Sequence, residues 1–190
     1  YSYINNENTI KVNIENPGTL VDSILNTGKR PFNITKLIVS GTLNDDDFTC
    51  IHETMTSLVE VDLSNITNKN GIKFSGKEKL FKVVLPRNIE SIEDNTFLNC
   101  NKLEYITSFN TNPPSVANNL GINTDFCTLF IPKEAFTNYG KHHYWSKFIN
   151  IETLDPNYYK KISIKTNLSS DNDINHYYYI NDTIKIAPPS

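Results

Sequence analysis

The sequence predicts an α/β solenoid, with about five to six repeating units of 22–24 residues in one parallel sheet and a short antiparallel β segment after them. Three observations lead to this fold class. An apolar triplet with offsets of zero, three and five residues, such as Leu80, Val83 and Leu85, fits neither a helix period nor a plain strand alternation. The triplet recurs at a nearly fixed interval. After Leu154 the interval stops, and polar and apolar residues alternate as in strands.

The triplet occurs six times, twice with a polar third member. Its members are Ile34, Leu37 and Val39; Leu58, Val61 and Leu63; Leu80, Val83 and Leu85; Leu103, Ile106 and Ser108; Phe126, Leu129 and Ile131; and Phe148, Ile151 and Thr153. Successive units begin 22–24 residues apart, a spacing typical of leucine-rich repeats. Each triplet is interpreted as a short strand whose apolar members, Phe126 included, point into a core shared with the neighbouring units.

The segments that return from one strand to the next differ in kind. Between residues 85 and 103, Ile89 and Ile92 predict a second short strand, and Phe97 and Cys100 are expected to fill the core from a tight turn. Between residues 39 and 58, Phe48, Ile51 and Met55 recur at helical spacing, which predicts a helix. The segment 68–79 lacks the Phe and Cys plugs. The repeats are therefore expected to be irregular.

The residues of this return segment resemble a known repeat. The segment from Leu80 to Ile106 is similar to the BspA-type leucine-rich repeat, in which a strand, a Pro, a second strand with Ile and a Phe-x-x-Cys-x-x-Leu phrase follow one another. The matching residues are Leu85, Pro86, Ile89, Ile92, Phe97, Cys100 and Leu103. The resemblance implies an irregular leucine-rich-repeat solenoid.

The two ends of the array carry further resemblances. The phrase LFIPKEAFTNYGKHHYWSKFINI is similar to the last unit of such arrays in surface proteins of Bacteroidetes, with a helix at Ala135, Phe136 and Tyr139 and then Trp145, Phe148 and Ile151. Upstream, PGTLVDSI resembles the start of these arrays, where a helix around Leu20 and Ile24 caps the first strand. The resemblance covers about residues 10–154. It implies a secreted or cell-surface protein that acts in adhesion.

These patterns divide the chain into three parts. Residues 1–30 are expected to form an N-terminal strand and capping helix, and residues 31–155 the leucine-rich-repeat domain. Residues 156–190 are expected to form a C-terminal β segment, either packed on the last repeat or beginning another domain. That segment resembles the opening of a bacterial β-repeat similar to the listerial internalin B-repeat.

Composition limits the partners and the location. The net charge of −3 provides no basic field for nucleic acid, and no apolar run is long enough to span a bilayer. The chain begins without Met, so we expect a processed protein, extracellular, on the cell surface or anchored to the outer membrane after signal removal. Sequons such as Asn33 and Asn65 leave the source open between a bacterium and a protist. A monomer is expected.

No pattern in the sequence indicates catalysis, a metal site or a cofactor. Asp45, Asp46 and Asp47 are interpreted as helix-start residues rather than calcium ligands, because a calcium loop alternates its donors and needs a Gly. The adjacent pair His142 and His143 is expected in a solvated loop.

The three cysteines are also interpreted without a catalytic role. Cys100 and Cys50 fit structural positions in the core, and Cys127 is expected to point away from the side of Phe126. None has the base and the hydrogen-bond donors that a nucleophilic thiol needs.

The alternate residues of the predicted strands form the candidate binding surface, because they project in parallel from a rigid scaffold. The predicted binding residues are Glu60, Asp62, Lys82, Val84, Tyr105, Thr107, Phe109 and Phe130, and the same phase includes Lys36, Ile38 and Thr128. Tyr105 and Phe130 are expected to be solvent-accessible. An aromatic patch with a charged rim fits a protein or glycan partner. In the alternatives, the tail or the loop at Pro113 and Pro114 covers this surface, or the chain is an architectural spacer.

Overall fold

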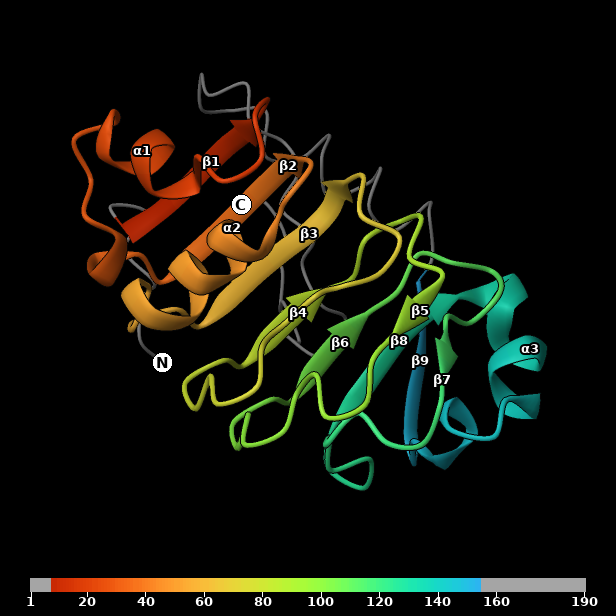
Figure 1. Cartoon of the computed structure of the whole chain (residues 1–190). Coiled ribbons are helices and arrows are strands. Elements are labelled where there is room, and N and C mark those ends of the chain that lie inside the picture. The colour runs from red at the N-terminus through yellow and green to blue at the C-terminus, as the bar shows by residue number, and fades with distance from the viewer. Residues whose placement is uncertain (1–7, 155–190) are drawn as a thin grey trace, which may run out of the picture. The chain divides into compact units, whose positions relative to one another are not determined.

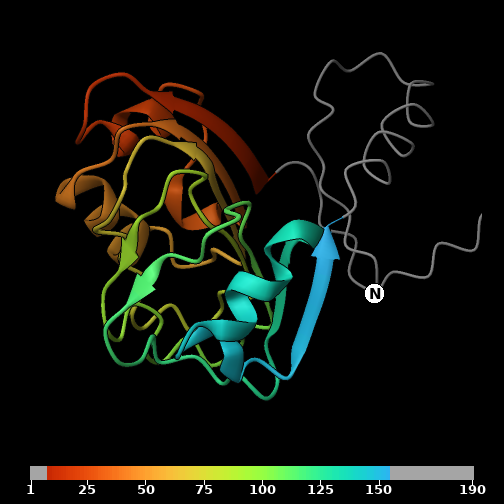
Figure 2. The same ribbon diagram turned by 90° about the vertical axis from the view of Figure 1, so that its right-hand side faces the viewer.

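A computed structural model describes residues 8–154 and shows a seven-stranded sheet, with short helices and a second, two-stranded sheet on one side of it (Figures 1 and 2). In sheet order, the strands of the main sheet are β1 (Thr9–Ile14), β2 (Lys36–Gly41), β3 (Glu60–Ile66), β4 (Lys82–Val84), β6 (Tyr105–Thr107), β8 (Thr128–Pro132) and β9 (Asn150–Leu154). Neighbouring strands from β1 to β8 are parallel. The predicted parallel repeat sheet is therefore confirmed.

The rest of the described chain forms short elements, some of which the sequence predicts. They are α1 (Leu20–Leu25), η2 (Pro31–Asn33), α2 (Asp45–Thr49), the π-helix η3 (Cys50–Thr54), β5 (Ser91–Ile92), β7 (Ser115–Val116), η4 (Lys133–Ala135), α3 (Phe136–Lys141) and η5 (Trp145–Lys147). The second short strand expected around Ile92 is β5, and it pairs in parallel with β7. The predicted helix between residues 39 and 58 is α2 continued by η3.

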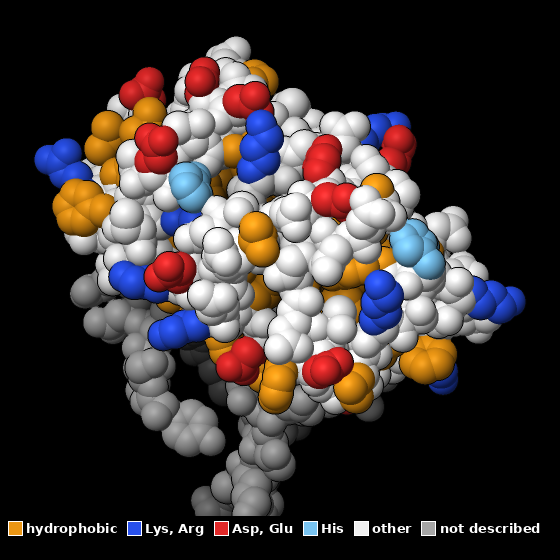
Figure 3. All heavy atoms as spheres, turned by 60° about the horizontal axis from the view of Figure 1, so that its bottom comes forward, with side chains coloured by type: hydrophobic (Ala, Val, Ile, Leu, Met, Phe, Trp, Pro, Cys, Tyr) orange, Lys and Arg blue, Asp and Glu red, His pale blue; other side chains and the backbone are white. Residues whose placement is uncertain are grey.

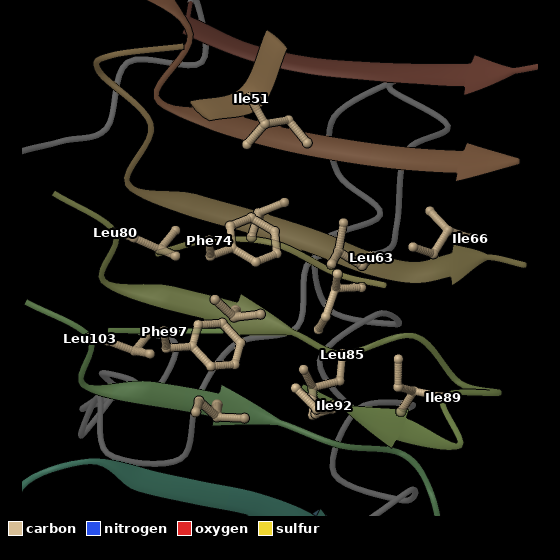
Figure 4. Packing of buried hydrophobic residues seen from close by; sticks show 14 of the residues in the cluster. Ile51, Leu63, Ile66, Phe74, Leu80, Leu85, Ile89, Ile92, Phe97 and Leu103 are labelled. Carbon is tan, nitrogen blue, oxygen red and sulfur yellow. The ribbon is translucent and has the colours of Figure 1, made fainter. Parts of the chain in front are cut away.

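The apolar triplets line the core between the main sheet and the return segments (Figure 4). Their central members are paired in register across five strands, and none is more than 1% exposed: Leu37, Val61, Val83, Ile106 and Leu129. Burying one such side chain contributes about 1.5–3 kcal/mol relative to leaving it in water. No unit could bury this row alone, which is why the units stack.

A row of aromatic rings fills the core behind the strands. Phe74 is fully buried, stacks on Phe97 with ring centroids 5.8 Å apart, and meets Phe48 edge-on at 6.2 Å (Figure 4). The prediction that segment 68–79 lacks the Phe plug is therefore wrong. Phe74 takes the place in its unit that Phe97 takes in the next unit, whereas Lys77 takes the place of Cys100.

Lys77 connects its unit to the preceding one although it is a cation in the core. Lys77 is only 6% exposed, and its Nζ donates to the carbonyl oxygens of Ile51 at 2.8 Å and Met55 at 2.7 Å. Cys100 does the same on a smaller scale, donating from Sγ to the carbonyl oxygen of Phe74 at 3.0 Å. Burial lowers the pKa of the Lys77 ammonium. Both side chains thus tie the turn of one unit to the backbone of the preceding unit.

One predicted core residue is on the surface. Phe126 is 76% exposed, whereas its neighbour Cys127 is fully buried, so the expected orientations of both are wrong. The backbone N–H groups of both residues donate to the carbonyl oxygen of Asn123, at 3.3 Å and 3.0 Å. This tight turn directs Phe126 outward and lets the smaller thiol enter the core, without changing the register of Thr128 with Tyr105.

The polar member of the fourth triplet is also accounted for. Ser108 is fully buried and accepts a hydrogen bond at 2.7 Å from the hydroxyl of Tyr139 on α3. Trp145, which follows Tyr139 by six residues, is also buried. Its Nε1 donates to the carbonyl oxygen of Pro114 at 2.8 Å. The Pro113–Pro114 loop is thus held by a core residue on the helical side of the sheet, which argues against its covering the opposite side.

The predicted antiparallel β segment at residues 156–190 lies outside the described residues, as do residues 1–7. The boundaries proposed for the three parts of the chain stay predictions. Within the described part, β1 and α1 are the strand and helix expected before residue 30.

Candidate protein-binding face

The candidate site is the side of the main sheet that faces away from α1 and α2, here called the strand face. Its residues form two rows, because the parallel strands are in register. The first row is Lys36, Glu60, Lys82, Tyr105 and Thr128, and the second is Ile38, Asp62, Val84, Thr107 and Phe130. The structure thus brings seven of the eight predicted binding residues into two adjacent rows, and Phe109 follows β6 by two residues.

Charged residues of the first row form a ladder along the β2 side of the strand face. The Glu60 carboxylate lies 3.2 Å from Nζ of Lys36 and 3.9 Å from Nζ of Lys82. Because the three side chains are only 11–23% exposed, water screens their interactions less than those of surface pairs. Their charges are held in fixed positions, which favours selective contact with a partner of complementary charge.

Aromatic residues continue the face on the β8 side. The Tyr105 ring meets the Phe81 ring edge-on with centroids 5.0 Å apart, and lies 6.1 Å from the Phe130 ring. The guanidinium of Arg87 lies 4.0 Å from the centroid of the Phe109 ring, within cation–π range. Phe81 and Arg87 were not among the predicted binding residues. Phe81 stands between the anchor Leu80 and Lys82, and Arg87 follows the triplet by two residues, so the phase of the strand pattern includes neither position.

The strand face is less accessible than the sequence predicts. Glu60, Asp62, Tyr105 and Phe109 are partly exposed, but four predicted binding residues are buried: Lys82 at 9% exposure, Val84 at 3%, Thr107 at 2% and Phe130 at 0%. The expectation that Phe130 is solvent-accessible is wrong. Alternation along a strand assigns these side chains to the strand face, but it does not determine how far each of them is exposed.

The remaining candidate groups have structural roles. Asn44 caps α2 and forms a capping box with Asp47, so the predicted helix-start role of the three aspartates is confirmed. Within residues 8–154, no three His, Cys, Asp or Glu side chains come together to hold a metal ion. His142 is not simply solvated as expected. It is half-buried, stacks on His143 with ring centroids 4.6 Å apart, and accepts backbone hydrogen bonds at Nδ1.

The three thiols are unsuited to nucleophilic chemistry. Burial raises the pKa of Cys50, that of Cys100 to about 11 and that of Cys127 to about 12. Each is thus protonated near neutral pH, whereas the thiolate is the reactive form.

Comparison with known families identifies the repeat. Six copies of the BspA type leucine rich repeat region match the chain, across residues 19–120, 48–149 and 72–186. The chain belongs to the BspA-type leucine-rich-repeat family. BspA-type repeats are typical of binding or surface modules rather than of enzymes. None of the curated proteins matches the chain.

Neither a field of one charge sign on the face shown in Figure 3 nor a membrane-spanning helix is seen in the described part of the chain. On the side of the molecule shown in Figure 3, acidic and basic side chains are interspersed rather than gathered into a field of one sign. In the described part of the chain, no helix has the length and apolar character needed to cross a bilayer.

Proposed function

We propose that this chain is a non-catalytic adhesion module of a secreted or cell-surface protein, and that it contacts a protein partner through the strand face. The observation that carries the proposal is the in-register row in which the Lys36–Glu60–Lys82 ladder continues into Tyr105. Protein interfaces favour aromatic anchors with polar and charged surroundings. The family supports the general role of a binding module, and the resemblance to surface proteins of Bacteroidetes supports the location.

A protein partner fits the strand face better than a small molecule does. The ladder and the aromatic row extend across β2, β3, β4, β6 and β8, so the surface is broad. The side chains are held by mutual contacts, so little ordering is needed when a partner binds. Pre-organisation of this kind lowers the entropic cost of association.

The test is a binding screen of the whole chain against arrays of host matrix proteins and of glycans, followed by affinity measurements with Tyr105→Ser. A partly exposed central aromatic typically contributes about 2 kcal/mol or more to binding. We therefore expect Tyr105→Ser to weaken the tightest protein interaction by well over about tenfold. Phe136→Ser is the matched control, because Phe136 is 53% exposed but lies on α3.

Three results would contradict the proposal. Absence of any bound protein would favour the architectural spacer. A response of the glycan array alone would favour a glycan partner. An equal loss of affinity in the Tyr105→Ser and Phe136→Ser variants would show that the contact does not involve the strand face.

A further inference from the structure

A hollow lies outside the strand face, on the three turns that follow β3, β4 and β6. This hollow, here called the loop hollow, has a volume of about 350 Å³ and is open to solvent. Its polar side chains are Asn88, Asn110, Thr111 and Asn112, and the buried Ile89 and the pair Lys69 and Glu90 complete the lining. The site thus draws residues from successive repeats.

Hydrogen bonds between repeats fix the walls of the loop hollow. The backbone N–H of Glu90 donates to the carbonyl oxygen of Lys69 at 2.7 Å, and Nδ2 of Asn110 donates to that of Ile89 at 3.0 Å. On the far wall, Nδ2 of Asn138 lies 3.1 Å from both the carbonyl oxygen of Thr111 and Oδ1 of Asn112. The hollow is therefore formed before a ligand arrives.

Several polar groups of the loop hollow remain available for a ligand. Among the described residues, the side chains of Asn88 and Thr111 have no hydrogen-bond partner, and Asn112 keeps its Nδ2 donor. An amide both donates and accepts, and a hydroxyl does the same. Such groups match a ligand that itself presents many hydroxyl groups.

The loop hollow has no net positive charge, so an anionic ligand is not the one that fits it best. Nζ of Lys69 lies 2.6 Å from Oε1 of Glu90, so the two charges of the lining compensate each other. A peptide fits poorly as well, because peptide grooves provide apolar pockets for side chains, and Ile89 is the one apolar residue of the lining.

We propose that the loop hollow binds a neutral oligosaccharide. The Asn88 amide, the Thr111 hydroxyl and the Asn112 amide bind its hydroxyl groups, and the fixed turns orient them. This site is separate from the strand face, so one repeat array engages a protein on its sheet and a sugar at the turns beyond the strands.

The test is an array of neutral, sialylated and sulfated oligosaccharides, followed by titration calorimetry with the tightest neutral binder. The double variant Asn88→Ala, Thr111→Val should weaken its affinity at least about tenfold, because two hydrogen bonds are lost. Both residues are exposed and hold no other side chain, so folding is unaffected. The matched control is Thr56→Val, Asn101→Ala, two exposed positions on turns that precede β3 and β6.

Four outcomes would overturn the inference: no neutral oligosaccharide binds, only sialylated or sulfated ones bind, the double variant binds as tightly as the native chain, or the control variant loses as much affinity. Tyr105→Ser separates the two sites. It should leave oligosaccharide affinity unchanged, and a loss there would move the sugar to the strand face. Failure of the protein screen alone would leave the loop hollow standing.

Discussion

Asp47 shows how one buried polar residue joins the N-terminal cap to the repeat array. It is 1% exposed, and its carboxylate accepts hydrogen bonds from the backbone N–H groups of Gly18 at 2.7 Å, Leu20 at 2.9 Å and Asn44 at 3.0 Å. Two of these donors lie at the start of α1, which has no side-chain cap of its own. A single carboxylate thus serves two helix starts, where negative charge is favoured.

Replacing this carboxylate should be costly for stability. Asp47→Asn retains one oxygen acceptor but places an amide N–H₂ against backbone donors. Because hydrogen bonds to charged groups contribute about 1.5–3 kcal/mol each, we expect the free energy of unfolding to fall by about 2 kcal/mol or more in urea denaturation. Asp46→Asn is the control, since Asp46 is exposed on the same helix. Similar losses in both variants would contradict the role of burial.

At the scale of elements, the imidazole of His142 stabilises the short helix η5. Its Nδ1 accepts from the backbone N–H of Tyr144 at 3.1 Å and, more weakly, from that of Trp145 at 3.5 Å. Only the neutral ring can accept these bonds. Burial, and secondly the charge of His143, lower the pKa of His142 below its ordinary value of 6.5.

This capping bond predicts a pH dependence with a defined sign. The unfolded chain binds the proton more readily than the folded chain, so stability is highest above pH 6.5 and falls as pH drops through that value toward the lowered pKa. We expect His142→Asn, which can accept but does not titrate, to flatten the decline in thermal midpoint between about pH 7.5 and 5.5. His143→Asn should flatten it less. An unchanged slope in His142→Asn would refute the capping role.

The strand elements could be predicted from the sequence more fully than the turns or the accessibility of the strand face. The triplet identifies strands because each core position must be apolar and in register with its neighbours. It misplaces Phe126, because the chain enters β8 through a turn in which the N–H groups of Phe126 and Cys127 both bond to Asn123, and the triplet pattern does not register that turn. The phase also assigns Phe130 to the strand face correctly, but no periodicity tells whether a neighbouring side chain covers it.

At the scale of the whole molecule, stacked repeats predict stability that varies along the chain. Each strand pairs only with the strands of adjacent units, so interactions are between nearest neighbours. The three cysteines lie in different units, all are free thiols, and all are buried, so each reports on the opening of its own region. Hydrophobic contacts between units nevertheless couple the opening of one region to that of the next.

Thiol labelling in mild urea tests whether stability varies along the chain. In the native chain, all three cysteines should react slowly, because burial keeps them protonated, with pKa values of about 11 for Cys100 and about 12 for Cys127. Asp47→Asn should accelerate the labelling of Cys50 at least about tenfold more than that of Cys127, since it weakens the N-terminal units and the effect decays with each interface. Mass spectrometry of labelled peptides distinguishes the sites. Equal acceleration at all three cysteines would show that the array opens as one cooperative unit. In that case the interfaces between repeats transmit the whole loss of stability along the chain, and no repeat has a stability of its own.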